Sequence, residues 1–196
     1  LDSLLTNAQS LGLNKLDYQE AYAKAIQAGP NADSLLLKVA IRFFDHIANG
    51  NSTPKLQYEG ARFNKNGYDI PELVITYAKR NNLAGLVRYF TMNAKEVGII
   101  LDTLHYYMDS NHFDKDKVQL LEKAANEFRW LSSIRNNNKI ILVNIPAAHL
   151  NAYDSNALKI YMRVIVGKSW TKTNTLSSLV TRVVLNPYWH VPVSII

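Results

Sequence analysis

Residues 139–196 read KIILVNIPAAHLNAYDSNALKIYMRVIVGKSWTKTNTLSSLVTRVVLNPYWHVPVSII, and they decide the fold class. Only here do β-branched and aromatic residues gather in the short runs that are typical of strands, at 140–145, 160–166 and 180–184. The turn formers Asp154-Ser155-Asn156-Ala157 predict a hairpin, and Gly167 is expected to end the next strand. Because the rest of the chain predicts helices, we expect an α+β fold.

The first 135 residues repeat apolar side chains at helical spacing. The strongest stripe predicts a central helix with Asp33 as N-cap and Gly50 as its end, and it consists of Leu35, Leu36, Val39, Ala40, Phe43, Phe44 and Ile47. Asn93 and Glu96 predict a capping box. The expected helices span 1–11, 17–28, 33–49, 71–80, 83–92, 93–108 and 114–131, the last burying Val118, Leu121, Ala125 and Phe128. Residues 49–70 predict an exposed connection with little regular structure.

Charge is distributed unevenly along the chain, whose formal net charge is +6. No acidic residue follows Asp154, whereas five basic residues do: Lys159, Arg163, Lys168, Lys172 and Arg182. This surplus predicts either a solvated face of the sheet or a groove for an acidic ligand. A nucleic-acid binder is a third interpretation, but no motif supports it. No apolar run approaches the roughly 20 residues of a spanning helix, so no stable membrane insertion is expected, while a removed signal peptide stays open.

The sequence contains none of the common catalytic or cofactor motifs. It has no cysteine, its five histidines form no metal-binding pattern, and its glycines do not cluster into a phosphate loop. No serine lies in a Gly-x-Ser-x-Gly elbow. We therefore predict no metal, no cofactor and no catalytic residue within the chain.

Residues 186–192, Asn-Pro-Tyr-Trp-His-Val-Pro, are the most distinctive short segment. Two prolines in such a segment break strand pairing and turn the chain outward, as binding loops often do. Trp189 either closes the end of the core or contributes to such a loop.

Four segments together resemble the opening half of an L,D-transpeptidase catalytic domain of the YkuD type, in its YcbB-like branch: VNIPA (143–147), RVIVGK (163–168), KTNTLSS (172–178) and VLNPYWHVP (184–192). Arg129-Trp130-Leu131 is similar to the end of the helical scaffold in that branch. One departure is Thr173-Asn174, where the family usually has Thr-Pro.

The resemblance implies a helical scaffold domain at 1–135, followed at 136–196 by the first strands of a β-sandwich catalytic domain. It implies an enzyme of the periplasm or cell envelope that cross-links peptidoglycan stem peptides through a cysteine thiolate. The family's His and its Ser-x-Gly-Cys-x-Arg motif are absent from these residues, so the chain by itself is expected to be inactive. The alternative is a non-catalytic module that binds peptidoglycan or a partner protein. By resemblance, Trp189, His190 and Val191 would contact the acyl-donor stem peptide.

Overall fold

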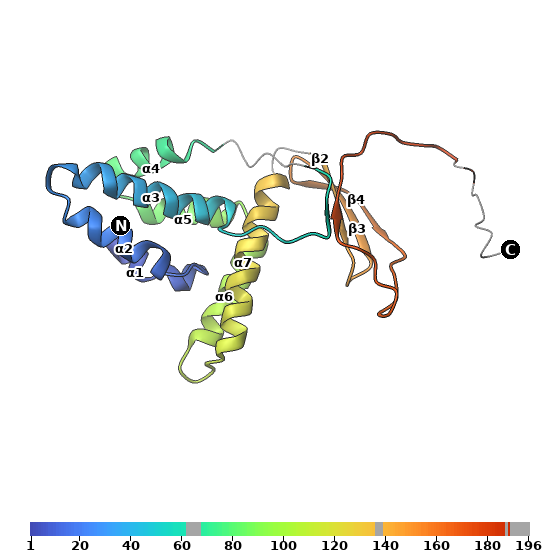
Figure 1. Ribbon diagram of the computed structural model, residues 1–196, viewed down its shortest axis with the longest axis horizontal. Helices are drawn as coiled ribbons and strands as arrows, with labels where there is room; N and C mark the ends of the chain where they lie inside the picture. The colour runs from blue at the N-terminus through green and yellow to red at the C-terminus, as the bar shows by residue number, and fades with distance from the viewer. Residues whose placement is uncertain (62–67, 136–138, 187, 189–196) are drawn as a thin grey trace. The chain divides into compact units, whose positions relative to one another are not determined.

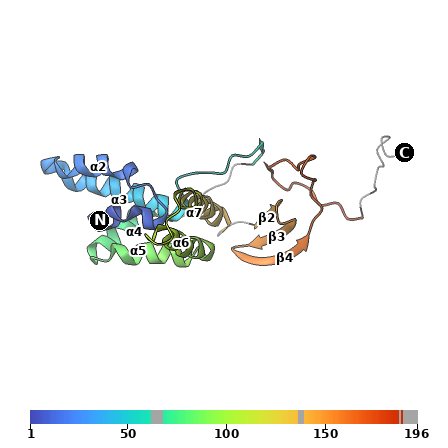
Figure 2. The same cartoon turned by 90° about the horizontal axis from the view of Figure 1, so that it is seen from below.

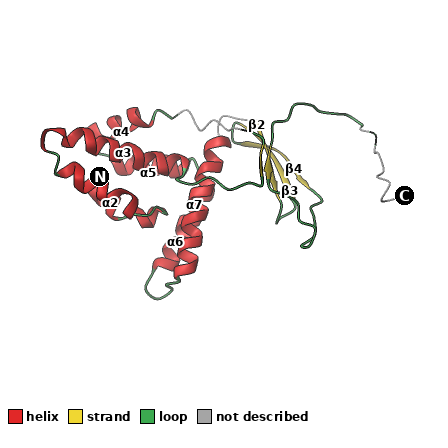
Figure 3. Ribbon diagram, in the orientation of Figure 1, coloured by secondary structure: helices red, strands yellow, loops and turns green. Residues whose placement is uncertain are grey.

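A computed structural model describes residues 1–61, 68–135, 139–186 and 188. Helices occupy the first part of the chain and an antiparallel sheet follows them, which confirms the predicted α+β class (Figure 3). The chain forms two compact units. The first contains Leu1–Pro54 and Asn64–Val166, and the second contains Lys55–Phe63 and Gly167–Ile196. The predicted domain boundary at residue 135 stays a prediction. Within the described residues, no helix is both long and apolar enough to span a bilayer.

Seven α-helices are described, and most lie within a few residues of the expected ranges (Figure 1). They are α1 (Asp2–Thr6), α2 (Leu16–Ile26), α3 (Ala32–Asn49), α4 (Ile70–Lys79), α5 (Leu83–Met92), α6 (Lys95–Met108) and α7 (Lys115–Arg135). Short 3₁₀ turns η1 (Ala8–Leu11) and η2 (Gly29–Asn31) precede α2 and α3. The last helix extends to Arg135, four residues beyond the predicted end.

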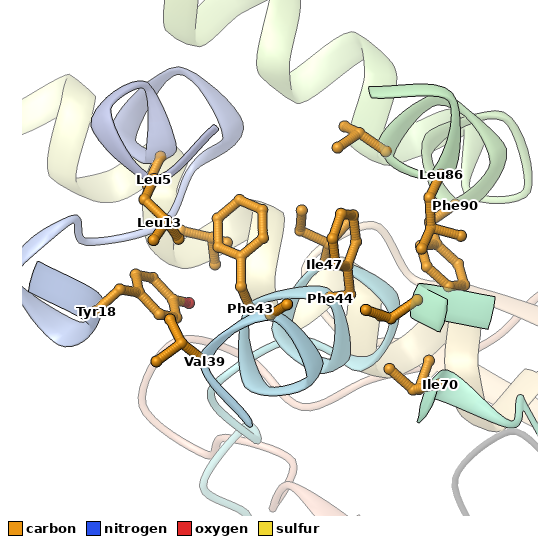
Figure 4. Close-up of a cluster of buried hydrophobic side chains, with 14 residues drawn as sticks. Leu5, Leu13, Tyr18, Val39, Phe43, Phe44, Ile47, Ile70, Leu86 and Phe90 are labelled. Atoms are coloured by element: carbon orange, nitrogen blue, oxygen red, sulfur yellow. The ribbon is translucent and has the colours of Figure 1, made fainter. Parts of the chain in front are cut away.

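The larger core forms around the apolar stripe of α3 (Figure 4). Phe43 and Phe44 are completely buried, and their rings meet edge to face. Figure 4 shows Leu5, Leu13 and Tyr18 on one side of this stripe, and Leu86 and Phe90 on the other. A second cluster lies between α6 and α7, which run side by side (Figures 1 and 2), and it contains Ala94, Val97, Leu101, Leu104, Val118 and Ala125.

Two predicted helix caps are wrong. Helix α3 begins at Ala32, so Asp33 lies inside its first turn, where a negative charge suits the helix dipole. Helix α6 has Ala94 at its cap position and makes no side-chain cap bond. The predicted capping box fails because its members have other partners: the Asn93 amide donates to the Tyr68 hydroxyl, and Glu96 accepts from Arg135.

Helix α7 buries polar side chains that the hydrophobic pattern did not indicate. Phe128, predicted on the buried face, is 37% exposed, whereas Asn126 and Arg129 are buried. Asn126 Nδ2 donates to the Gly12 carbonyl at 2.7 Å, and Arg129 Nη2 donates to the Leu11 carbonyl at 2.6 Å. Burial lowers the pKa of the Arg129 guanidinium to about 10. These bonds hold α7 against the turn that follows η1.

Strands β2 (Lys139–Asn144), β3 (His149–Asp154) and β4 (Ala157–Arg163) form an antiparallel sheet in the order β2-β3-β4. The predicted hairpin at 154–157 is confirmed, with Ser155 and Asn156 at positive φ. Strand β3 was not predicted, because its residues HLNAYD include no β-branched side chain. Strand β4 ends at Arg163 instead of Gly167, and the described residues 180–184 form no strand, so both predictions are wrong.

The second unit contains a pair of two-residue strands. Strand β1 (Tyr58–Glu59) pairs in parallel with β5 (Leu176–Ser177). The connection at 49–70, predicted to have little regular structure, thus contributes a strand to the unit that contains residues 167–186.

We predict that Asn126→Ala lowers the free energy of unfolding by about 2 kcal/mol, because the buried Gly12 carbonyl loses its donor. Urea unfolding at pH 7 measures this loss. Lys123→Ala, at an exposed position on the same helix, is the matched control and should change stability by less than about 0.5 kcal/mol. Equal effects of the two substitutions would contradict a structural role for Asn126.

Candidate functional site

The residues predicted to contact substrate, Trp189, His190 and Val191, lie outside the described residues. Tyr188 beside them is described and is almost fully exposed. Their role stays a prediction, and the site is built here from the segments that precede them.

The three-stranded sheet has one apolar face and a second, more polar face on which Ile140 and Leu142 also lie. Residues directly opposite each other on neighbouring strands share a face, and the register places six apolar side chains together: Ile141, Val143, Leu150, Ala152, Ile160 and Met162. The opposite face carries polar groups that include Asn144, His149 and Arg163, which are cross-strand partners. On this polar face the Tyr161 hydroxyl lies 3.0 Å from His149 Nε2, and the two rings are in contact. This face therefore presents hydrogen-bonding groups beside an exposed aromatic ring.

Residues 167–173 form a closed basic loop, which contains Lys168 and Lys172 and lies in the second unit. The Gly167 amide donates to Thr173 Oγ1 at 2.7 Å, and the Thr171 amide donates to the Lys168 carbonyl at 3.0 Å. A Cβ atom at Gly167 would lie 1.9 Å from the Thr171 carbonyl oxygen, so only glycine fits this turn. Lys168 Nζ lies 5.3 Å from the centre of the Trp170 ring, which is 76% exposed. The loop presents a cation and an indole together to solvent.

Residues 57–60, which include strand β1, hydrogen-bond to the residues that follow this loop. The Gln57 amide donates to the Thr175 carbonyl at 2.9 Å, and Gln57 Oε1 accepts from the Thr175 amide at 2.9 Å. The Gly60 amide then donates to the Ser177 carbonyl. Ser177 is buried, and its hydroxyl has no partner among the described residues. These bonds fix the path of residues 175–177, which follow Thr173-Asn174, where the sequence differs from the Thr-Pro that the family usually has.

An ion pair lies at the end of α7, where the chain leaves the helices. Arg135 Nη1 and Nη2 donate to the two carboxylate oxygens of Glu96 at 2.9 and 3.2 Å, and Arg135 is 7% exposed. The guanidinium lies 4.8 Å from the centre of the Tyr153 ring on β3. The hydrogen bond from Arg135 lowers the pKa of the Glu96 carboxyl. No sequence pattern indicated this contact, because its three residues are far apart in the chain.

All five basic residues that follow Asp154 are exposed, with Lys159 and Arg163 in the first unit and the other three in the second. Their exposure does not distinguish a solvated face from a binding groove. Among the described residues, no group of three or more histidine, aspartate or glutamate side chains could hold a metal ion. The chain supplies no cysteine nucleophile.

Comparison with known proteins agrees with the resemblance found in the sequence. Residues 138–196 match the family model YkuD, the L,D-transpeptidase catalytic domain. A Haemophilus influenzae protein named "Putative L,D-transpeptidase" is 29% identical over 118 residues, which cover 54% of this chain and 24% of that protein. The chain therefore spans about a quarter of the length of this relative. No solved structure gives a significant match. The recognition of the YkuD family is confirmed for the matched region.

Replacing Gly167 should open the basic loop. We expect Gly167→Ala to speed amide hydrogen exchange of Thr171 and the loop amides around it by tenfold or more, because the new Cβ collides with the Thr171 backbone. Gly98→Ala is the matched control, since nothing lies within 4 Å of the added Cβ on helix α6. The control should leave loop exchange unchanged and stabilise the protein by about 0.5–1 kcal/mol. Unchanged Thr171 exchange in Gly167→Ala would refute the closed loop.

The Glu96–Arg135 pair predicts a pH-dependent stability. Because the pKa of Glu96 is lowered in the folded state, its contribution is complete above the ordinary value of 4.5 and is lost as pH falls through the lowered value. Glu96→Gln should thus destabilise the protein at pH 7 by about 1 kcal/mol, a figure discounted because the Glu96 side chain is 39% exposed. Urea unfolding at pH 7 and pH 3 should show the difference shrinking in acid. A difference that persists at pH 3 would exclude the Glu96–Arg135 ion pair as its origin. Glu20→Gln, in the exposed Glu20–Lys24 pair, is the control.

Proposed function

We propose that this chain is part of a peptidoglycan L,D-transpeptidase of the cell envelope, in the YcbB-like branch. In this proposal, residues 1–135 form its helical scaffold, and residues 136–196 begin its catalytic β-domain. The match of residues 138–196 to the L,D-transpeptidase catalytic domain carries the proposal. The Arg129-Trp130-Leu131 sequence at the end of α7 supports the assignment of the branch.

In the proposed reaction, a cysteine thiolate attacks the carbonyl carbon of a stem tetrapeptide and releases D-alanine. The amine of a neighbouring stem then takes the acyl group and frees the thiolate. A thiolate suits this chemistry because a neighbouring histidine makes it nucleophilic near neutral pH. The chain described here contains no cysteine, so its own residues would bind and orient substrate.

Three features would serve binding. Trp189, His190 and Val191 are proposed to contact the acyl-donor stem. Lys168 beside the exposed Trp170 ring provides a cation for stem carboxylates and an apolar surface for their side chains. The Gln57–Thr175 bonds would keep the residues after this loop in place during binding.

A second candidate is a non-catalytic module of the envelope that holds peptidoglycan or a partner protein. The absence of cysteine together with the exposed basic residues favours this candidate over other non-enzymatic functions. A nucleic-acid binder would share the charge but would show binding that weakens steeply with salt and that peptidoglycan does not displace.

The test combines an activity assay with the coding frame. We expect the purified 196-residue protein to sediment with peptidoglycan sacculi and to yield no cross-linked muropeptide dimers from tetrapeptide substrates. The reading frame beyond residue 196 should supply a histidine and Ser-x-Gly-Cys-x-Arg. A frame without them would favour the non-catalytic module. Dimers formed by the 196 residues alone, or failure to bind sacculi, would refute the assignment of a binding role without a nucleophile.

A further inference from the structure

The closed basic loop at residues 167–173 presents an aromatic ring to solvent. Trp170 is 76% exposed, although tryptophan is highly buried on average. Its indole combines a flat apolar surface with one N–H donor, and such rings are enriched where proteins contact other molecules. The exposed indole, rather than the exposed lysines around it, is therefore the feature of this loop that indicates a ligand.

The backbone around this ring is fixed before any ligand binds. The Gly167 amide donates to Thr173 Oγ1, and the Thr171 amide donates to the Lys168 carbonyl, so two nested hydrogen bonds enclose Trp170. The turn also needs glycine at position 167, because a Cβ there would collide with the Thr171 carbonyl. A loop that is already ordered loses little conformational freedom on binding, and this lowers the entropic cost of holding a ligand.

The charge beside the ring determines which ligand would fit. Lys168 Nζ lies over the indole, 5.3 Å from the ring centre. Lys168 and Lys172 are the only charged side chains in the sequence of the loop, so its formal charge is +2. An anionic group next to a flat apolar surface would match the lysine and the indole together.

Two kinds of polymer carry flat rings beside negative charge: a glycan strand with acidic peptides attached, and a single-stranded nucleic acid. Proteins that bind single strands stack successive bases on several aromatic side chains along a basic groove, whereas this loop contains one aromatic residue. A pyranose ring needs only one indole, because its C–H groups form an apolar face of similar size. The loop also lies within residues 138–196, which match the L,D-transpeptidase catalytic domain, and this favours the glycan.

We infer that the closed basic loop binds peptidoglycan where a stem peptide joins the glycan strand, with the Trp170 ring stacked on the amino sugar and Lys168 paired with a carboxylate of the attached stem. The inference rests on the proposed function and extends it, because it makes the sugar a determinant of substrate binding besides the stem. The indole N–H can also donate to the acetamido oxygen of the sugar.

The test compares a disaccharide–tetrapeptide, N-acetylglucosaminyl-N-acetylmuramoyl tetrapeptide, with the same tetrapeptide free of sugar. In calorimetric titrations of the 196-residue protein, we expect the disaccharide form to bind about fivefold more tightly or better, because the sugar adds a stacking contact. The indole N–H signal of Trp170, assigned by its loss in Trp170→Phe, should shift with the disaccharide form and much less with the free tetrapeptide. Equal affinities, or an indole signal that does not shift, would overturn the inference.

Substitutions separate the ring from the cation. Trp170→Ala should reduce the affinity for the disaccharide form to that for the free tetrapeptide, and Trp170→Phe should keep part of the difference, because phenylalanine retains a flat ring. Lys168→Ala should weaken both ligands by about three- to tenfold, since both carry the stem carboxylates. Neither substitution should unfold the protein, because both side chains are exposed. A sugar-dependent difference that survives in Trp170→Ala would refute the stacking contact.

Phe113→Ala and Lys115→Ala, at exposed positions near the start of α7, are the matched controls. Neither should change the affinity for either ligand by more than about twofold. An equal loss in Phe113→Ala and Trp170→Ala would refute the location of the site. The trisaccharide of N-acetylglucosamine, which carries no carboxylate, should shift the Trp170 indole signal equally in the unchanged protein and in Lys168→Ala. No shift in either protein would overturn the sugar contact.

Further outcomes separate this inference from the proposed function. Sacculus binding together with equal affinities for the two tetrapeptide ligands would refute the sugar contact and leave the proposed function standing. Sugar-dependent binding in a protein whose reading frame lacks the cysteine motif would support the loop site and refute the enzyme. Single-stranded DNA that binds more tightly than the disaccharide–tetrapeptide, with steep weakening by salt, would refute the glycan in favour of a nucleic acid.

Discussion

The close approach of two glycines to helix α7 is the constraint on which the helical part depends. A Cβ atom at Gly50 would lie 2.2 Å from the Asn126 carbonyl oxygen, and one at Gly12 would lie 3.1 Å from the Ala125 Cβ. Both glycines have positive φ, so they also end the preceding helical segments. Asn126 and Arg129 then bond to the backbone that these turns bring within reach. Helix α7 thus packs on α6 through apolar residues such as Val118 and Ala125, and it bonds to the backbone beside the larger core through Asn126 and Arg129.

Helix α7 is also the last element before the three-stranded sheet. Its last residue, Arg135, contacts Glu96 from α6 and the Tyr153 ring from β3. The Arg135 side chain therefore hydrogen-bonds to helix α6, and its guanidinium lies over the Tyr153 ring of the β3–β4 hairpin.

Helix positions were predictable because apolar residues repeat at helical spacing, as α5 shows by matching its expected range of 83–92. Caps were less predictable, since Asn93 and Glu96 prefer tertiary partners that the local sequence does not reveal. Strand β3 was missed because HLNAYD contains no β-branched residue. The segment 184–192 carried much of the resemblance to the YkuD family, although residues 187 and 189–192 lie outside the described part. The contacts of Arg135 with Glu96 and Tyr153 could not be predicted, because these residues are distant in sequence.

Strand β1 has a consequence for the order of folding. Gln57 bonds to Thr175 across 118 residues, and the whole segment from α4 to β4 lies in the loop that this contact closes. Contacts of such sequence separation form late, because loop closure must precede any gain in stability. During synthesis, helices α1 to α3 emerge long before residue 175 and can pack early. The segment at 55–61 lacks its partner until residues 175–177 have been synthesised, so we expect the second unit to fold after helices α1 to α3.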